Sequence, residues 1–210
     1  MIKILVADDH SVVREGIKQI LAGQKDMVVE DEAVNGQEVL SRTAQKNYDL
    51  ILLDISMPGR SGLEILEEIK TRHPKLPVLI LSMHPEEQYA VRTLRAGAAG
   101  YLTKASAPQE LISAIQKVSR GGKYVTVSLA EKLAFELDAG AERPSHEKLS
   151  NREYQVMLML ASGKSVSEAA QELCLSSKTI STYRTRILEK MRMKKNAELT
   201  LYAVKNNLIL

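Results

Sequence analysis

The chain has 210 residues, enough for two small domains with separate cores, and its 44% hydrophobic and 26% charged residues exclude disordered and fibrous classes. The net charge is only +3, but residues 150–210 carry ten basic and five acidic side chains, which indicates a polyanionic partner for the second half. The single cysteine excludes an intramolecular disulfide framework. No signal region and no apolar stretch of roughly 20 residues is present, so we expect a cytoplasmic protein without a membrane partner.

Residues 1–124 alternate short apolar runs with amphipathic stretches of helical length. Apolar, β-branched runs without polar alternation are typical of strands that are covered on both faces. The stretches between the runs are long enough for crossover helices. The pattern therefore predicts an α/β fold, a doubly wound parallel sheet with five strands at 2–7, 27–34, 49–53, 77–81 and 99–102.

A polar segment separates this first domain from the rest of the chain. It follows a helical patch over 128–137, covers 138–148, and contains Gly140 and Pro144 but no apolar period. This composition is typical of an interdomain linker. We therefore expect a first domain over 1–124, a helix and linker over 125–148, and a second domain over 149–210.

The second domain is predicted to be entirely helical. Ser150 with Glu153, and Ser165 with Glu168, have the spacing of capping boxes, which start helices. Only Cys174 and the two residues after it separate the second helix from the third, which is the tight turn of a helix-turn-helix. We expect Cys174, in an apolar segment, to be a small buried hydrophobe and not a nucleophile. The four helices of this all-α domain are expected at about 150–162, 166–173, 177–192 and 196–206.

Polar side chains follow four of the predicted strands at their carboxyl ends. Ligands of doubly wound sheets bind at this edge, so we expect these side chains to lie together. Clustered carboxylates raise one another's pKa unless a cation lies among them, and Mg²⁺ is the natural partner for carboxylates and phosphate oxygens. Acidic residues also follow strands simply because loops are polar, but three acidic residues together with a serine and a lysine favour a site. They are Asp8, Asp9, Asp54, Ser82 and Lys104.

Three segments within residues 1 to about 120 resemble the signature segments of response-regulator receivers, which have a flavodoxin-like fold. They are ILVADDH at 4–10, DLILLDISMPG at 49–59 and GAAGYLTK at 97–104. The resemblance implies that Asp54 is the nucleophile that accepts a phosphoryl group from a histidine kinase. It also implies that Mg²⁺ is bound by Asp9, Asp54 and the backbone carbonyl of Ser56, with Asp8 acting through water.

The same resemblance implies a switch. Lys104 would pair with the phosphoryl oxygens, and Ser82 would move to hydrogen-bond them, which lets Tyr101 swing inward. Ser82 stands where many receivers carry Thr, so we expect a looser switch. We interpret His10, beside the acid pair, as a rim residue and not a metal ligand, because no second His or Cys lies nearby in the sequence.

The helix predicted at 177–192 has one apolar and one polar face. Ile180, Tyr183, Ile187 and Met191 recur at intervals of three and four. The opposite face combines short hydroxyls, which reach base edges in the major groove, with cations for phosphates. A solvated amphipathic helix has the same pattern, so the pattern alone leaves both open. The polar residues are Lys178, Ser181, Thr182, Thr185 and Arg186, with Arg184 and Lys190 to the sides.

Three segments of residues 149–210 resemble the LuxR-type helix-turn-helix. They are LSNRE at 149–153, GKSVSEAA at 163–170 and LSSKTISTYR at 175–184. The resemblance implies a recognition helix at 177–191, with Thr179 among the DNA contacts, and a dimerisation helix at 196–206. Relatives often carry Lys and His at positions 181 and 183, where this chain has Ser181 and Tyr183. It therefore looks most similar to the BvgA and EvgA subgroup.

Together the two resemblances imply a response regulator of the NarL/FixJ class. Such a protein is not an enzyme but a homodimer that binds half-sites on double-stranded DNA under the control of Asp54 phosphorylation. One alternative is an aspartyl-phosphate phosphohydrolase, but Ser56 stands where its second carboxylate would be expected. Another is a DNA-binding regulator that does not depend on phosphorylation, against which the acid triad and Lys104 argue.

Overall fold

Five short parallel strands form the centre of residues 1–133 in the computed structural model of this chain, which describes residues 1–127, 129–131, 133 and 144–209. The strand order is β2-β1-β3-β4-β5, and every neighbouring pair is parallel. Each strand begins and ends within one residue of its predicted position, so the predicted sheet is confirmed. The strands are Ile2–Ala7 (β1), Met27–Ala33 (β2), Leu50–Leu53 (β3), Val78–Ser82 (β4) and Gly100–Thr103 (β5).

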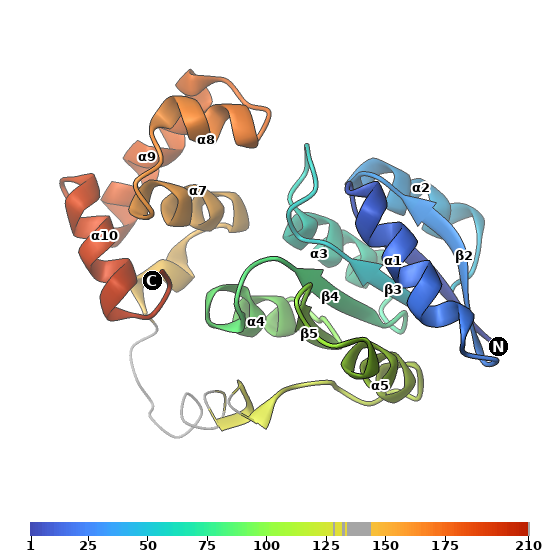
Figure 1. The fold of residues 1–210 in the computed structure, drawn as a ribbon. Coiled ribbons are helices and arrows are strands. Elements are labelled where there is room, and N and C mark those ends of the chain that lie inside the picture. Colours follow the sequence, from blue (N-terminus) through green and yellow to red (C-terminus); the bar gives the residue numbers. More distant parts are fainter. Residues whose placement is uncertain (128, 132, 134–143, 210) are drawn as a thin grey trace. The chain divides into compact units, whose positions relative to one another are not determined.

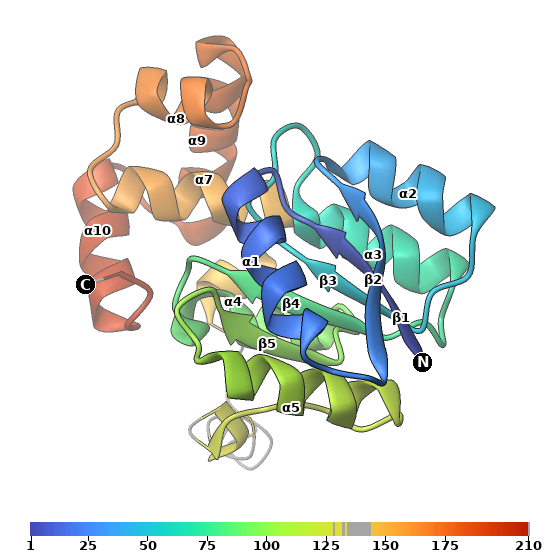
Figure 2. The same ribbon diagram turned by 45° about the vertical axis from the view of Figure 1, so that its right-hand side comes forward.

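Helices cover both faces of this sheet. Figures 1 and 2 show α1 and α5 on one face and α2, α3 and α4 on the other. Leu21 of α1 and Ile115 of α5 accordingly pack in one buried cluster with Val6 and Leu52 of the strands. Burial on both faces explains the uninterrupted apolar runs of β3 and β4, whereas β2, at the edge of the sheet, carries Glu30, Asp31 and Glu32 and is only partly buried. The helices are Ser11–Ala22 (α1), Gly36–Gln45 (α2), Gly62–Arg72 (α3), Glu86–Arg95 (α4) and Pro108–Ser119 (α5).

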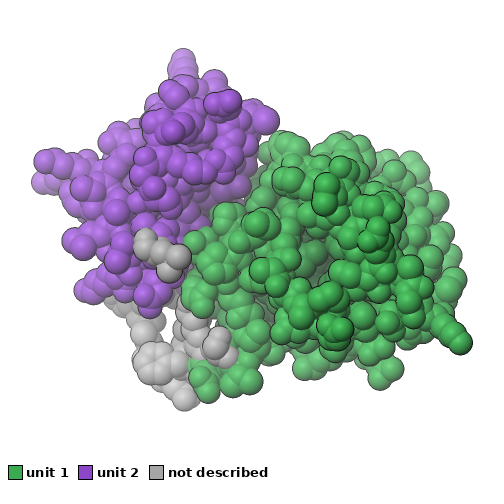
Figure 3. Space-filling view, viewed as in Figure 1, with its two compact units in different colours: residues 1–133 green, residues 134–210 purple. Residues whose placement is uncertain are grey.

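The chain divides into two compact units, residues 1–133 and residues 134–210 (Figure 3). The predicted helical patch at 128–137 and linker at 138–148 fall partly outside the described residues, because 128, 132 and 134–143 are not among them. The last residues of the predicted linker form a short 3₁₀ helix, η1, at Ser145–Lys148.

Four α-helices follow η1 in the described part of the second unit, as predicted. Both capping boxes are formed: Ser150 Oγ accepts the Glu153 N–H, Ser165 Oγ accepts the Glu168 N–H, and each glutamate accepts the N–H of its serine. These caps are local contacts across three residues, which is why the sequence predicts the helix starts well. The helices are Asn151–Ala161 (α7), Val166–Glu172 (α8), Ser177–Met191 (α9) and Asn196–Lys205 (α10).

The predicted burial of Cys174 is wrong. Helix α8 ends at Glu172, and Cys174 lies beyond it with a left-handed φ of 53° and an exposed side chain. The Cys174 N–H donates to the Gln171 carbonyl, and the Leu175 N–H donates to the Ala170 carbonyl. This is a Schellman motif, in which the left-handed residue reverses the chain. Cys174 occupies the turn itself, whereas its neighbour Leu173 reaches the core.

Among the helices that the structure describes, none combines the length and the apolar character needed to cross a bilayer.

Candidate functional site

Three of the five polar residues predicted at the carboxyl ends of the strands form one buried cluster. Asp8 follows β1, Asp54 follows β3, and both are only 1% exposed. Lys104, which follows β5, places its Nζ 2.6 Å from Asp8 Oδ2 and 2.7 Å from Asp54 Oδ2. The backbone N–H of Ser56 donates to Asp54 Oδ1 over 2.9 Å and so fixes the orientation of this carboxylate.

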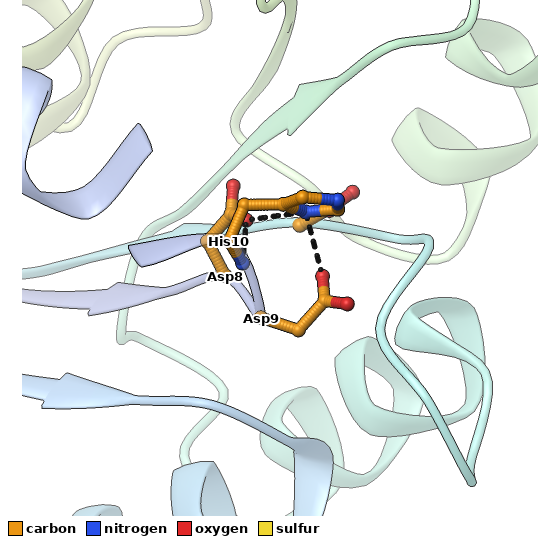
Figure 4. A group of neighbouring side chains, drawn as sticks. Asp8, Asp9 and His10 are labelled. Atoms are coloured by element: carbon orange, nitrogen blue, oxygen red, sulfur yellow. Dashed lines mark hydrogen bonds and ion pairs between the residues drawn. The ribbon is translucent and has the colours of Figure 1, made fainter. Parts of the chain in front are cut away.

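His10 belongs to the same cluster. Its Nδ1 lies 3.0 Å from Asp9 Oδ1 and 3.3 Å from Asp8 Oδ1 (Figure 4). Ligand atoms of these three residues and Asp54 all lie within 4.8 Å of one another. The His10 side chain is 64% exposed, as expected for a rim residue. No second His or Cys lies near His10 in the sequence, but carboxylates complete a group of potential ligands around it.

Burial controls the charges of the cluster. It raises the pKa of the Asp54 carboxyl, and this effect outweighs the opposite effect of the Lys104 ammonium. Burial also disfavours the charged form of Lys104, but the hydrogen bond to Asp54 and the close contact with the Asp8 carboxylate outweigh it and raise the pKa of Lys104. The lysine therefore stays protonated between the Asp8 and Asp54 carboxylates.

The donor set fits a hard divalent cation. Asp8 Oδ2 is buried and, although close to Lys104 Nζ, accepts no hydrogen bond of good geometry among the described residues. With Asp9 and Asp54, the cluster offers carboxylate oxygens, the ligands that Mg²⁺ prefers.

The two predicted switch residues, Ser82 and Tyr101, both contact the backbone of His84, a residue that the sequence motifs do not single out. Ser82 ends β4 and is fully buried, and its Oγ accepts the N–H of His84 over 3.1 Å. Tyr101 of β5 is also fully buried, and its hydroxyl donates to the His84 carbonyl over 2.8 Å. Ser82 and Tyr101 therefore contact the same backbone residue, just before α4.

Helix α9 has the two faces that the sequence predicts. Ile180, Ile187 and Met191 are buried, and Tyr183 is half-buried. Thr179 and Arg184 are half-buried at the border between the faces. The exposed face carries Lys178, Ser181, Thr182, Thr185, Arg186 and Lys190.

Two of the predicted cations have partners inside the second unit. Arg184 Nε donates to Asn196 Oδ1 of α10 over 2.7 Å, which orients the guanidinium. Lys190 Nζ lies 2.6 Å from Glu153 Oε2, in the capping box of α7. The sequence predicts only a DNA contact for Lys190, because a pairing across 37 residues leaves no local pattern.

We expect Lys190→Met to lower the free energy of unfolding by about 1 kcal/mol or less at pH 7, because Lys190 is partly exposed and screened. Burial disfavours ionised Glu153, but hydrogen bonds from Lys190 and Ser150 outweigh it and lower the pKa of Glu153 below 4.5. The stabilisation is therefore complete above pH 4.5 and disappears as the pH falls through the lowered pKa. Urea denaturation of Lys190→Met, wild type and the exposed control Lys178→Met at pH 7 and pH 3 measures the difference. An equal loss at both pH values would contradict the ion pair.

Comparison with known proteins shows the family of each half of the chain. Family models match the chain over residues 4–116 (response regulator receiver domain) and 147–203 (bacterial regulatory proteins, luxR family). Response regulator GacA of Pseudomonas protegens is 37% identical over 209 residues, which cover 100% of this chain and 98% of GacA. Response regulator UvrY of Escherichia coli K12 is 36% identical, with 99% and 96% covered. The BvgA and EvgA subgroup stays a prediction.

Solved structures have the same architecture. The structure of RcsB from Salmonella enterica serovar Typhimurium, bound to promoter rprA in the presence of the phosphomimetic BeF₃⁻, is 25% identical with a TM-score of 0.66. The alignment covers 97% of this chain and 99% of RcsB. The chain therefore belongs to the response regulators of the NarL/FixJ class, transcriptional regulators in which phosphorylation of a receiver domain controls DNA binding by a LuxR-family helix-turn-helix.

Proposed function

We propose that Asp54 accepts a phosphoryl group from a histidine kinase in the cytoplasm and that this controls homodimerisation and promoter binding. The observation that carries the proposal is the buried cluster of Asp8, Asp54 and Lys104 at the carboxyl ends of the strands. In this chain the receiver domain would occupy residues 1–124, and the DNA-binding domain would occupy residues 149–210.

The residues of the cluster divide the chemistry of this transfer. An Asp54 carboxylate oxygen attacks the phosphorus, the phosphorus–nitrogen bond of the kinase phosphohistidine breaks, and the electron pair returns to the imidazole. Asp9, Asp54 and the Ser56 carbonyl would hold Mg²⁺, with Asp8 acting through water. The bound metal offsets negative charge on the attacking and transferred oxygens. Lys104 pairs with the phosphoryl oxygens, and Ser82 turns its hydroxyl toward them. Tyr101, which was expected to swing inward at this step, is already fully buried in this structure.

Helix α9 supplies the DNA contacts. Lys178, Arg184 and Arg186 contact phosphates, with Lys190 joining them where its pairing with Glu153 allows. Thr179, Ser181, Thr182 and Thr185 contact base edges. The similarity to RcsB, whose structure is bound to promoter rprA, supports DNA binding by this chain, and the exposed polar face of α9 supports the choice of residues. On α10, Leu201 is 72% exposed and Val204 48% exposed, and this apolar surface supports a homodimer built on α10.

We expect wild type treated with acetyl phosphate and Mg²⁺ to dimerise and bind DNA more tightly, and Lys104→Ala to be labelled without this gain. A lost charged hydrogen bond in a partly buried site costs about 1.5 to 3 kcal/mol, which reduces the coupling roughly tenfold or more. Sedimentation and DNA titration with and without the donor measure both effects.

Lys70→Ala is the control, because Lys70 bonds carbonyls of Pro74 and Leu76 instead of the carboxylate cluster. An unchanged affinity ratio in Lys104→Ala would refute the role of Lys104. If the DNA affinity and the dimerisation of the wild type do not respond to the donor, a regulator that does not depend on phosphorylation is favoured. Sustained turnover of a phosphomonoester would favour a phosphohydrolase.

A further inference from the structure

The segment that follows α5, residues 123–127, returns along the outer edge of the sheet; Figure 1 shows it where the chain turns yellow. Tyr124 forms a parallel bridge with Gly100 of β5, and its N–H donates to the Ala99 carbonyl over 2.8 Å. Lys123 Nζ donates to the Ala98 carbonyl over 2.6 Å. We call residues 123–127 the return segment.

Gly100 shows how closely the return segment approaches β5. A Cβ atom at this position would lie 2.6 Å from the Tyr124 carbonyl oxygen and 2.9 Å from Tyr124 Cβ. Only glycine allows this approach of two backbones. The edge of β5 is therefore covered by the chain's own return segment.

The return segment is also joined to the first residue of α4. Thr126 Oγ1 donates to Glu86 Oε2 over 2.7 Å, a charge-assisted hydrogen bond between partly buried residues. The same oxygen accepts the N–H of Leu129 over 3.3 Å. Leu129 itself is buried, with only 3% of its surface exposed.

Glu86 lies two residues after His84, the residue that contacts both Ser82 and Tyr101. The His84 ring also packs against Tyr89 of α4, with centroids 4.9 Å apart. A displacement of the Ser82 hydroxyl therefore reaches His84, then the start of α4, and then Thr126. Thr126 is the last of these residues before the chain continues toward the second unit.

We propose that the Glu86–Thr126 hydrogen bond is a positioning contact that couples the Asp54 site to the segment leading into the DNA-binding domain. This inference rests on the proposed function, because it names the route by which phosphorylation of Asp54 is transmitted. The bond fixes the position of the return segment relative to the start of α4. Movement of the loop at His84 therefore also moves the return segment and the chain that follows it.

The test compares substitutions that separate the hydrogen bond from shape and charge. Thr126→Val removes the hydroxyl and keeps the shape, whereas Thr126→Ser keeps the hydroxyl. Glu86→Ala removes the acceptor, and Glu87→Ala is its matched control, since it removes an exposed carboxylate from the same helical turn. The readout is the ratio of DNA affinities with and without acetyl phosphate and Mg²⁺, on a duplex that the phosphorylated wild type selects from a randomised pool.

We expect the ratio to fall by about tenfold in Thr126→Val and in Glu86→Ala, since charged hydrogen bonds are among the stronger ones. The double variant should lose no more than either single variant. Thr126→Ser and Glu87→Ala should keep the wild-type ratio, and labelling of Asp54 and affinity without the donor should stay unchanged throughout. A wild-type ratio in Thr126→Val, or equal losses in Glu86→Ala and Glu87→Ala, overturns this contact alone. A ratio of one in the wild type overturns the proposed function and this inference with it.

Discussion

Replacing Asp54 with alanine is expected to abolish labelling of the chain by acetyl phosphate in the presence of Mg²⁺. The acyl phosphate requires a carboxylate oxygen as nucleophile, and Asp54 presents its carboxylate at the centre of the cluster, held by Lys104 and the Ser56 N–H. Chelation of Mg²⁺ should likewise suppress labelling of the wild type, because Asp8 and Asp9 would then repel the incoming phosphate without compensation. Mass spectrometry of the intact chain and of its peptides measures both effects.

Asp49→Ala is the matched control for this experiment. Asp49 directly precedes the same strand, β3. Its carboxylate accepts the backbone N–H of Lys3 at the amino ends of the strands, away from the carboxylate cluster. This variant should be labelled like the wild type. Labelling that persists in Asp54→Ala, or that ignores chelation, would remove Asp54 from the role of phosphoacceptor.

Substitutions on α9 are expected to separate into two classes. Lys178→Ala should weaken binding to all duplexes alike and reduce the salt slope by about 0.9, because a phosphate contact carries no sequence information. Thr182→Ala should weaken binding to the preferred duplex by roughly 1 to 3 kcal/mol and change little elsewhere. The Thr182 hydroxyl donates to the Lys178 carbonyl within the helix, so its oxygen and methyl group remain to meet a base edge.

Titration against the preferred and a random duplex at several salt concentrations distinguishes these classes. Lys164→Ala controls for the loss of one positive charge, since Lys164 precedes α8 and pairs with Glu172. A homodimer built on α10 should also need two half-sites about 10 base pairs apart, or a multiple of that spacing. Equal losses for Lys178→Ala and Thr182→Ala on both duplexes, or no loss for either, would place the recognition surface elsewhere.

The strands, the helix starts and the residue types of both candidate sites can be predicted from the sequence alone. Strands buried on both faces are apolar throughout, and capping boxes join residues three apart, so both leave local patterns. Asp8, Asp54 and Lys104 could be predicted to meet because parallel strands end at one edge of the sheet.

The tertiary structure decided which partners these side chains have. Lys190 pairs with Glu153, and Thr126 with Glu86, across 37 and 40 residues, and no local period records such distant pairings. The exposure of Cys174 depends on a left-handed turn that its apolar neighbours do not reveal. These features follow from the packing of whole elements, because a side chain's partners are set by where distant backbones come together and not by its neighbours along the chain.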